Sequence, residues 1–257
     1  MTVTRVVRLA ASTVGAVVLL GVFFRMEDLH ARILLAVWPQ YPNALPFQGG
    51  TMWQMGVRTV ELVLLSTLLC VVIGIPLGVI ATRPRFRDEW APVVDGLVNA
   101  GQTIPSLAIV ALALPLLGFG FVPALVAMVL YGLLPVLRNT AVALETVDKA
   151  QLDAGRGMGM TPWQLLWMVE LPHSIPVILA GIRTSAVLNV GVAVIAGLIG
   201  AGGFGTAIVH GIDLRVPPLV WYGAVPTALL AVIMDLFLRR LEEILTPRGL
   251  RLRAARR

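Results

Sequence analysis

The sequence is poor in charged residues. Only 13% of its 257 residues are charged, whereas a soluble domain usually carries about 25%. Hydrophobic residues make up 58% of the chain, which leaves too little polar surface to cover a core in water. The scarcity of charge therefore argues against a soluble protein, and a mean hydropathy of +0.87 favours a membrane protein.

Residues that form cross-links, metal sites and catalytic centres are also few. The one cysteine, Cys70, lies in an apolar run, so no disulfide framework exists within the chain and Cys70 is expected to be a packing residue. The three histidines, His30, His173 and His210, are scattered, which suits neither a metal site nor a catalytic triad. The phosphate-binding patterns GxxxxGKS and GxxxxGKT are absent, so we expect no ATP hydrolysis, cofactor or metal in this chain.

Long apolar runs are abundant. Six of them are long enough to cross a bilayer as helices, at about 1.5 Å per residue against a hydrocarbon core of roughly 30 Å. They are 6–24, 57–81, 93–117, 121–137, 175–199 and 219–238. Their continuous apolarity argues against the period-two alternation of a β-barrel. The sequence predicts an all-α polytopic membrane protein with about six transmembrane helices, of which 121–137 is the shortest.

The first apolar run has two interpretations. Arg5 and Arg8 precede it, as in a signal peptide, but no small-residue cleavage site of the usual kind follows Phe24. A retained first span is favoured. The outer loop that follows, 25–56, carries Trp38, Tyr41 and Trp53 and is expected to anchor at the membrane interface, with docking of an external partner as the secondary alternative.

Basic residues are unevenly distributed between the predicted loops. Placing both termini in the cytoplasm puts fifteen of the twenty basic residues inside, as the positive-inside rule favours. Four lie outside and Arg183 falls within the fifth span. The net charge of +6 is thus explained by topology, and the basic tail 241–257 needs no nucleic-acid partner.

This topology places the polar segment 151–172, QLDAGRGMGMTPWQLLWMVELP, in the cytoplasm between spans four and five. We expect two short helices joined by a glycine turn, the first covering about 144–153. Gly155, Gly157 and Gly159 are expected to break it, because glycine costs about 1 kcal/mol at a helix interior.

The restart of the helix has its own signals. Thr161 is a good N-cap, Pro162 suits the first helical position, and Gln164 completes a capping box. Pro172 is expected to interrupt this second helix.

This helix-turn-helix shape has three interpretations. The second helix carries Trp163, Trp167 and Met168 but no Arg or Lys to meet phosphates or bases, which argues against DNA binding. A segment that only returned the chain to the membrane would need only a few residues. Apolar side chains exposed beside a turn of small residues favour the third interpretation, a surface that binds a protein partner.

The spacing within this segment resembles one known family. Bacterial binding-protein-dependent ABC importer permeases carry a motif of EAA, three residues, G, nine residues, I, one residue and LP. This sequence has Asp153, Ala154, Gly155, then Gly159, then Val169, Leu171 and Pro172 at the same spacing. Asp153, Gly155 and Val169 replace glutamate, alanine and isoleucine. The resemblance implies that these residues belong to a coupling loop, 141–173, that docks on an ATPase subunit.

The resemblance also implies partners and a location. Such permeases reside in the bacterial cytoplasmic (inner) membrane, where two permease subunits, either a homodimer or a pair of paralogues, work with two ATPases and an extracytoplasmic solute-binding protein. ATP and Mg are then bound by the ATPases and not by this chain. The implied domains are an N-terminal helix and outer loop, 1–50, a transmembrane domain, 51–240, and the basic tail, 241–257.

Several stretches are similar to the osmoprotectant permeases for glycine betaine, choline or carnitine. They are QTIPSLA at 102–108, LYGLLPVLRNT at 130–140, and the stretches 157–172 and 180–205. A permease for another cargo, such as methionine, phosphonate or a betaine-like thione, is the first alternative. A secondary transporter would predict inverted repeats and charged midplane residues, and an intramembrane enzyme would need converging catalytic groups. Neither pattern is found.

The third predicted span opens with polar residues, namely Gln102, Thr103, Pro105 and Ser106. Pro105 removes a backbone donor, so the stretch is either a structural kink or a discontinuous helix that lines a substrate path. Asn189, deep in the fifth span, is the other candidate for an interior polar contact.

The last motif is the glycine-rich stretch IGAGGFG, 199–205. No strand precedes it and no lysine follows it, which argues against a phosphate loop. We expect Gly200, Gly202, Gly203 and Gly205 to form a turn that closes the outer end of span five, and the resemblance places that turn near an external gate.

Charged residues near the spans are expected to pair structurally. Arg58 and Glu61 are three residues apart on one helical face, which favours a local ion pair. Arg183 could snorkel or face the bundle.

Overall fold

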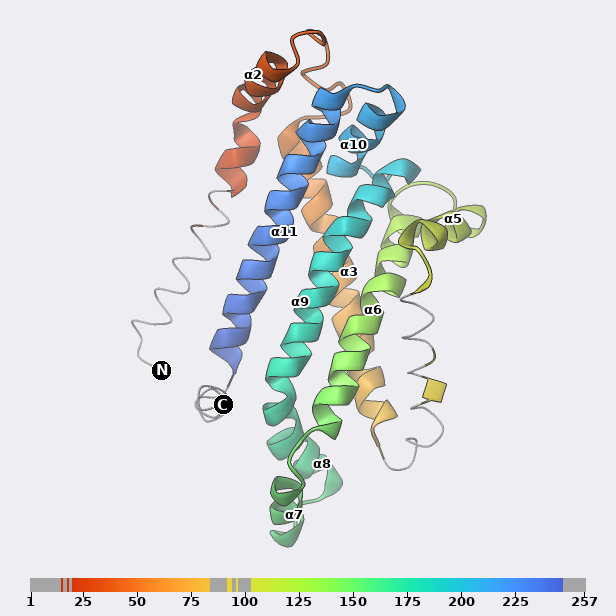
Figure 1. Cartoon of the computed structure of the whole chain (residues 1–257). Helices are drawn as coiled ribbons and strands as arrows, with labels where there is room; N and C mark the ends of the chain where they lie inside the picture. The colour runs from red at the N-terminus through yellow and green to blue at the C-terminus, as the bar shows by residue number, and fades with distance from the viewer. Residues whose placement is uncertain are drawn as a thin grey trace.

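The computed structural model describes residues 15, 18, 20–83, 92–93, 96 and 103–246. Within these ranges the chain is helical and contains no strand. Four helical stretches are long and apolar enough to cross a membrane, and they run side by side along the long axis of the molecule (Figure 1). They are α3 (Met52–Ala81), α6 (Phe121–Glu145), the continuous stretch Pro162–Ile199 that contains α9 (Leu171–Ala196), and α11 (Pro217–Leu245).

Four of the six predicted spans lie within these helices, and two of the helices extend well beyond the predicted segments. Segment 121–137 is part of a longer helix, because α6 continues to Glu145. The helical stretch that contains the fifth predicted span, 175–199, begins at Pro162. Both extensions mix polar with apolar residues, so a search for continuous apolar runs misses them.

The first and third predicted spans are described only in part. Segment 6–24 lies mostly outside the described residues, as does 93–102. The longest described part of the third segment is α5 (Ser106–Leu117), which has 12 residues and follows an extended Pro105. A helix of that length rises about 18 Å and does not cross a bilayer by itself.

The bundle is built around α9, which packs against α3, α6 and α11. Small residues allow the helices to approach closely. A Cβ at Gly78 of α3 would lie 2.7 Å from the Cβ of Thr140 in α6, and one at Gly181 of α9 would lie 2.6 Å from the Cβ of Asn139. Such small-residue contacts are the usual means by which helices associate in a membrane.

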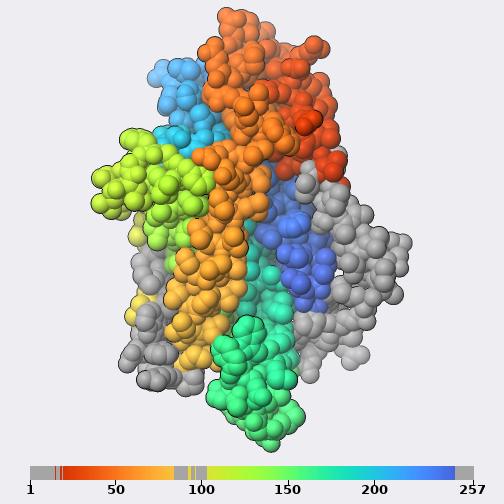
Figure 2. Space-filling model, turned by 180° about the vertical axis from the view of Figure 1, so that it is seen from behind, coloured from red at the N-terminus to blue at the C-terminus, as the bar shows by residue number. Residues whose placement is uncertain are grey.

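The two ends of the bundle are different. At one end lie α2 (Glu27–Val37) and α10 (Phe204–Asp213), where the Glu27 carboxylate accepts hydrogen bonds from the Tyr222 hydroxyl (2.5 Å) and the Met52 N–H (3.2 Å). At the opposite end, α7 (Lys149–Gly157) and α8 (Pro162–Leu165) project beyond the spans (Figure 2).

Candidate functional site

The projecting end begins with α7, whose boundaries correct the sequence prediction. The helix predicted over 144–153 is wrong, because α6 ends at Glu145 and α7 starts after Asp148, which caps it by accepting from the Ala150 N–H at 3.0 Å. Gly155 and Gly157 lie inside α7 instead of breaking it. A Cβ at Gly155 would come within 2.6 Å of Leu165 Cδ1, so this glycine lets α7 pack closely on the next helix.

Gly159 alone forms the turn. Its φ is +79°, in the left-handed region. The Gly159 N–H donates to Arg156 O at 2.9 Å and the Met160 N–H donates to Gly155 O at 3.1 Å. These two bonds form the Schellman arrangement that ends a helix with glycine at the residue after the cap.

The restart at Thr161 is confirmed. Its hydroxyl accepts from the Gln164 N–H at 3.3 Å, while Gln164 Oε1 accepts from the Thr161 N–H at 2.9 Å. Pro162 occupies the first turn of α8. The predicted capping box therefore fixes where the second helix begins.

The predicted interruption at Pro172 is wrong, because the helix passes through it. The π-helical turn η1 (Leu166–Glu170) lies between α8 and α9, and the Leu171 N–H bonds to Leu166 O. Proline lacks an N–H and its ring crowds the carbonyl four residues earlier. The wider turn accommodates Pro172 without ending the helix, and such π turns occur often at functional sites.

The surface of this end is formed by α7, the Gly159 turn, α8 and the exposed Trp167 and Met168 of η1, and we refer to it as the α7–α8 surface. Asp153, Ala154 and Gly159 are exposed on it, whereas Gly155 is buried and Val169, Leu171 and Pro172 are half-buried. Large apolar side chains are also exposed there, namely Met158, Trp163, Trp167 and Met168. The two tryptophan rings pack edge to face, with their centroids 5.6 Å apart. An exposed apolar group of this size is typical of a protein-binding surface.

One ion pair at this end was not predicted. Arg83 Nη2, just beyond α3, lies 2.6 Å from Glu170 Oε2 in the π turn. Both side chains are largely covered, with 26% and 11% exposed. Because the two residues are 87 apart in the sequence, no local pattern could have paired them.

At the opposite end, the predicted glycine turn is confirmed. The 3-10 turn η2 (Gly197–Ile199) follows α9, and Gly200, Gly202 and Gly203 have φ of +74°, +87° and +79°. Gly205 lies in the first turn of α10 instead, where a Cβ would collide with Val194 O.

Two residues of α3, Arg58 and Thr59, hold this turn in place, and of their contacts only the Arg58–Glu61 ion pair was predicted. Arg58 forms the expected ion pair with Glu61 at 2.8 Å, and its Nε also donates to Ala201 O at 3.0 Å. Thr59 Oγ1 accepts from the buried Phe204 N–H at 3.0 Å. The turn is therefore attached to α3 as well as to α9.

The predicted path residues lie in two different settings. Gln102 is outside the described residues, while Thr103 and Pro105 are exposed and Ser106 begins α5. Asn189 is fully buried and donates from Nδ2 to Ser66 Oγ at 3.0 Å. In this chain Asn189 is part of the helix packing.

Arg183 pairs within the bundle rather than standing alone. It lies 3.8 Å from Asp235 and 3.9 Å from Glu242, both on α11. Cys70 is buried, as predicted. Among the described residues, no three His, Cys, Asp or Glu side chains gather as a metal site.

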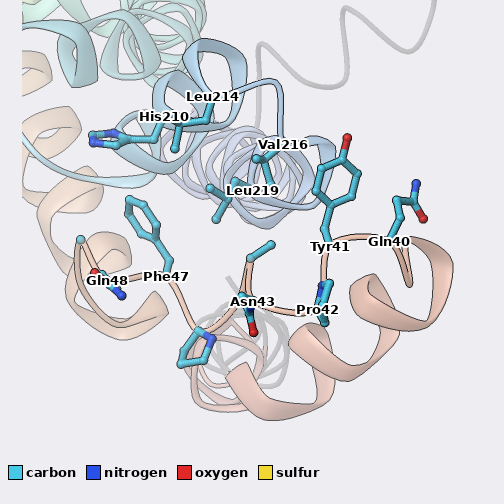
Figure 3. A pocket seen from close by; sticks show the side chains of 13 residues that line it. Gln40, Tyr41, Pro42, Asn43, Phe47, Gln48, His210, Leu214, Val216 and Leu219 are labelled. Atoms are coloured by element: carbon cyan, nitrogen blue, oxygen red, sulfur yellow. The ribbon is translucent and has the colours of Figure 1, made fainter.

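A cavity of about 700 Å³ opens beside α10, under the loop 40–49. Phe47 and His210 lie on one side of it, with ring centroids 5.6 Å apart, and Tyr41 lies on the other (Figure 3). The Tyr41 hydroxyl donates to Arg215 O at 3.4 Å. The predicted interfacial loop thus packs on α10 and the start of α11.

Four membrane-length helices among the described residues, with a helical projection at one end, define a multi-pass α-helical membrane protein. Residues 74–248 match the family described as "Binding-protein-dependent transport system inner membrane component". The chain belongs to this family and is a non-catalytic permease subunit of a transport system.

Its relatives include three permeases whose names specify a solute. The chain is 45% identical over 186 residues to the carnitine transport permease protein OpuCB of Listeria monocytogenes, covering 72% of this chain and 84% of the relative. It is 42% identical over 211 residues to the glycine betaine/carnitine/choline permease OpuCB of Bacillus subtilis, covering 82% and 96%. It is 44% identical to the osmoprotectant import permease OsmW of Salmonella typhimurium, covering 74% and 89%.

Solved structures with the same fold are more distant in sequence. A chain of the MetNI methionine ABC transporter in an inward-facing conformation gives a TM-score of 0.67 at 22% identity, covering 76% of this chain and 95% of that one. A chain of an amino acid ABC transporter gives 0.56 at 19% identity, covering 73% and 89%. These similarities establish the fold of an ABC importer permease.

Proposed function

We propose that this chain is the membrane-spanning subunit of an ATP-driven importer for a quaternary-amine osmoprotectant such as glycine betaine, carnitine or choline. The observation that carries the proposal is the set of relatives at 42–45% identity, each named for the transport of such solutes or of osmoprotectants. The methionine transporter is similar at 22% identity, which supports the fold and gives no reason to prefer methionine as cargo.

The α7–α8 surface is the proposed docking site for the ATPase. Asp153, Ala154 and Gly159 are exposed there, beside the apolar group that includes Trp163 and Trp167. A firm helix end at Gly159 and a fixed start at Thr161 give the surface a defined shape, which favours specific docking over loose contact. Two ATPases bind ATP and Mg in this proposal, and the permease binds neither.

The opposite end is proposed to face the exterior, where a solute-binding protein delivers cargo. The Gly200–Gly203 turn and the cavity under loop 40–49 lie at this end. The exposed Thr103 and Pro105 before α5 are proposed to line a path completed by a second permease subunit. Polar groups at membrane depth normally face such an interior.

Uptake by the reconstituted complex tests the cargo. The permease is expressed with its ATPase and binding protein, and accumulation of labelled glycine betaine, carnitine and choline is measured with methionine as the control solute. We expect ATP-dependent uptake of at least one quaternary amine, and calorimetric binding of the same amine by the binding protein. Uptake of methionine with no uptake or binding of any quaternary amine would overturn the proposal.

A further inference from the structure

We infer that Arg83 and Glu170 form a positioning ion pair through which movement of the α7–α8 surface is passed to α3. The inference rests on the proposed function, because it assumes that an ATPase moves this surface. Arg83 and Glu170 touch neither solute nor nucleotide in this proposal. They act through the helices that they join.

The first support is the position of the pair. The α7–α8 region makes its main contacts within itself and with α9, through η1. The contact between Arg83 Nη2 and Glu170 Oε2, at 2.6 Å, reaches sideways from this region to the inner end of α3. It therefore links the projecting end to a second transmembrane helix.

The second support is how firmly Arg83 is held. Its Nε donates to Val79 O at 3.2 Å, and Nη2 donates to the Thr82 hydroxyl at 3.4 Å as well as to Glu170. The guanidinium is thus fixed to the last turn of α3. A force on the Glu170 carboxylate acts on the helix and not on a free side chain.

The third support is burial. The Asp153–Arg156 pair on the α7–α8 surface is similar in length, at 2.9 Å, but its side chains are 70% and 63% exposed, respectively. Exposed pairs contribute little because water and salt screen them. The Arg83–Glu170 pair is largely covered, so removal of one partner leaves a poorly solvated charge.

The fourth support is the π turn itself. Glu170 is the last residue of η1, directly before Leu171, the first residue of α9, and two residues before Pro172. A π turn is a common site of functional irregularity in a helix, and here it lies between the proposed docking surface and the transmembrane part. Without the tie to α3, this turn could absorb movement of α8 while α3 stayed in place.

The test compares transport with ATP hydrolysis in the complete complex. Glu170→Gln and Arg83→Gln each remove one charge. The double variant Arg83→Glu with Glu170→Arg restores an ion pair in which the two charges have exchanged positions. Arg240→Gln is the matched control, since it breaks an exposed pair with Glu243 (3.4 Å) on α11. The readouts are co-purification of the ATPase, ATP hydrolysis, and solute transported per ATP hydrolysed.

We expect each single variant to co-purify with the ATPase and to hydrolyse ATP, while solute transported per ATP falls about tenfold, a usual size for coupling between sites. The charge swap should recover a substantial part of that ratio, and Arg240→Gln should keep it unchanged. An unchanged ratio in Glu170→Gln, or singles that lose the ATPase with no recovery in the swap, would overturn the inference. If the wild-type chain itself does not bind the ATPase, the proposed function fails, and the positioning role fails with it.

Discussion

Glycine residues at the two ends of the molecule are required for two different physical reasons. Gly159 has φ of +79°, yet a Cβ built on it would meet nothing within 4 Å. Gly205 has no such backbone strain, but a Cβ there would collide with Val194 O. The first glycine is needed for its backbone conformation, and the second for close packing of α10 on α9. Sequence spacing predicts both positions but does not separate the two reasons.

Substitution of Gly159 should test the conformational requirement. Gly159→Ala places a Cβ in the left-handed region, which costs about 1–2 kcal/mol, so we expect a loosened α7 end and reduced solute uptake. Gly159→Asn should retain more uptake, because asparagine tolerates this conformation better. The measurements are ATPase co-purification and uptake rate.

Gly157→Ala is the matched control for that substitution. Gly157 is the last residue of α7 and also has nothing within 4 Å of a built Cβ. Its φ is not in the left-handed region, so alanine should be neutral or slightly stabilising there. Equal uptake for Gly159→Ala and Gly157→Ala would show that the left-handed turn is unimportant.

At the scale of helices, the central packing depends on one crossing, where α3, α6 and α9 meet around buried polar side chains. Gly132 of α6 faces Asn189 and Ser185 of α9, and a Cβ on Gly132 would lie 2.7 Å from Asn189 Nδ2 and 2.8 Å from Ser185 Oγ. Asn189 in turn bonds to Ser66 of α3. Three helices are therefore held at one level by a small residue and buried polar groups.

Gly132→Ala should disturb this crossing. The added methyl has no room beside Asn189, and overpacking of this kind costs about 1–3 kcal/mol. We expect a lower melting temperature of the detergent-solubilised protein. Gly191→Ala on α9 serves as the control, because nothing lies within 4 Å of its built Cβ. A decrease of the same size in both variants would argue against a special role for the crossing.

The elements that the sequence predicts well are those with local causes. The capping box at Thr161 and the glycine turn after α9 follow from residues close together in the chain. The continuity of the helix through Pro172 was missed, because the π turn depends on a balance of hydrogen bonds that apolar patterns do not encode. The attachment of Thr59 to Phe204 was missed because 145 residues separate them.

For the whole molecule, the decisive feature is the continuous helical stretch Pro162–Ile199. Its 38 residues correspond to about 57 Å at 1.5 Å per residue. It begins on the proposed ATPase-docking surface and ends at the glycine turn attached to α3 by Arg58. A single helical stretch thus joins the two ends, and at its π turn, η1, the Arg83–Glu170 pair ties it to α3.

This arrangement requires that the two ends lie on opposite sides of the membrane, which cysteine labelling can establish. The only cysteine, Cys70, is buried, so a Cys70→Ala background is expected to fold normally. Lys149→Cys and Asp213→Cys then place single exposed thiols at the start of α7 and the end of α10.

A membrane-impermeant maleimide is applied to spheroplasts before and after permeabilisation. Because the positive-inside rule places α7 in the cytoplasm, the Asp213→Cys protein should be labelled in intact spheroplasts. The Lys149→Cys protein should be labelled only after permeabilisation. The reverse pattern would place α7 outside, beyond the reach of any cytoplasmic ATPase, and labelling of both variants in intact spheroplasts would contradict a membrane between the two ends.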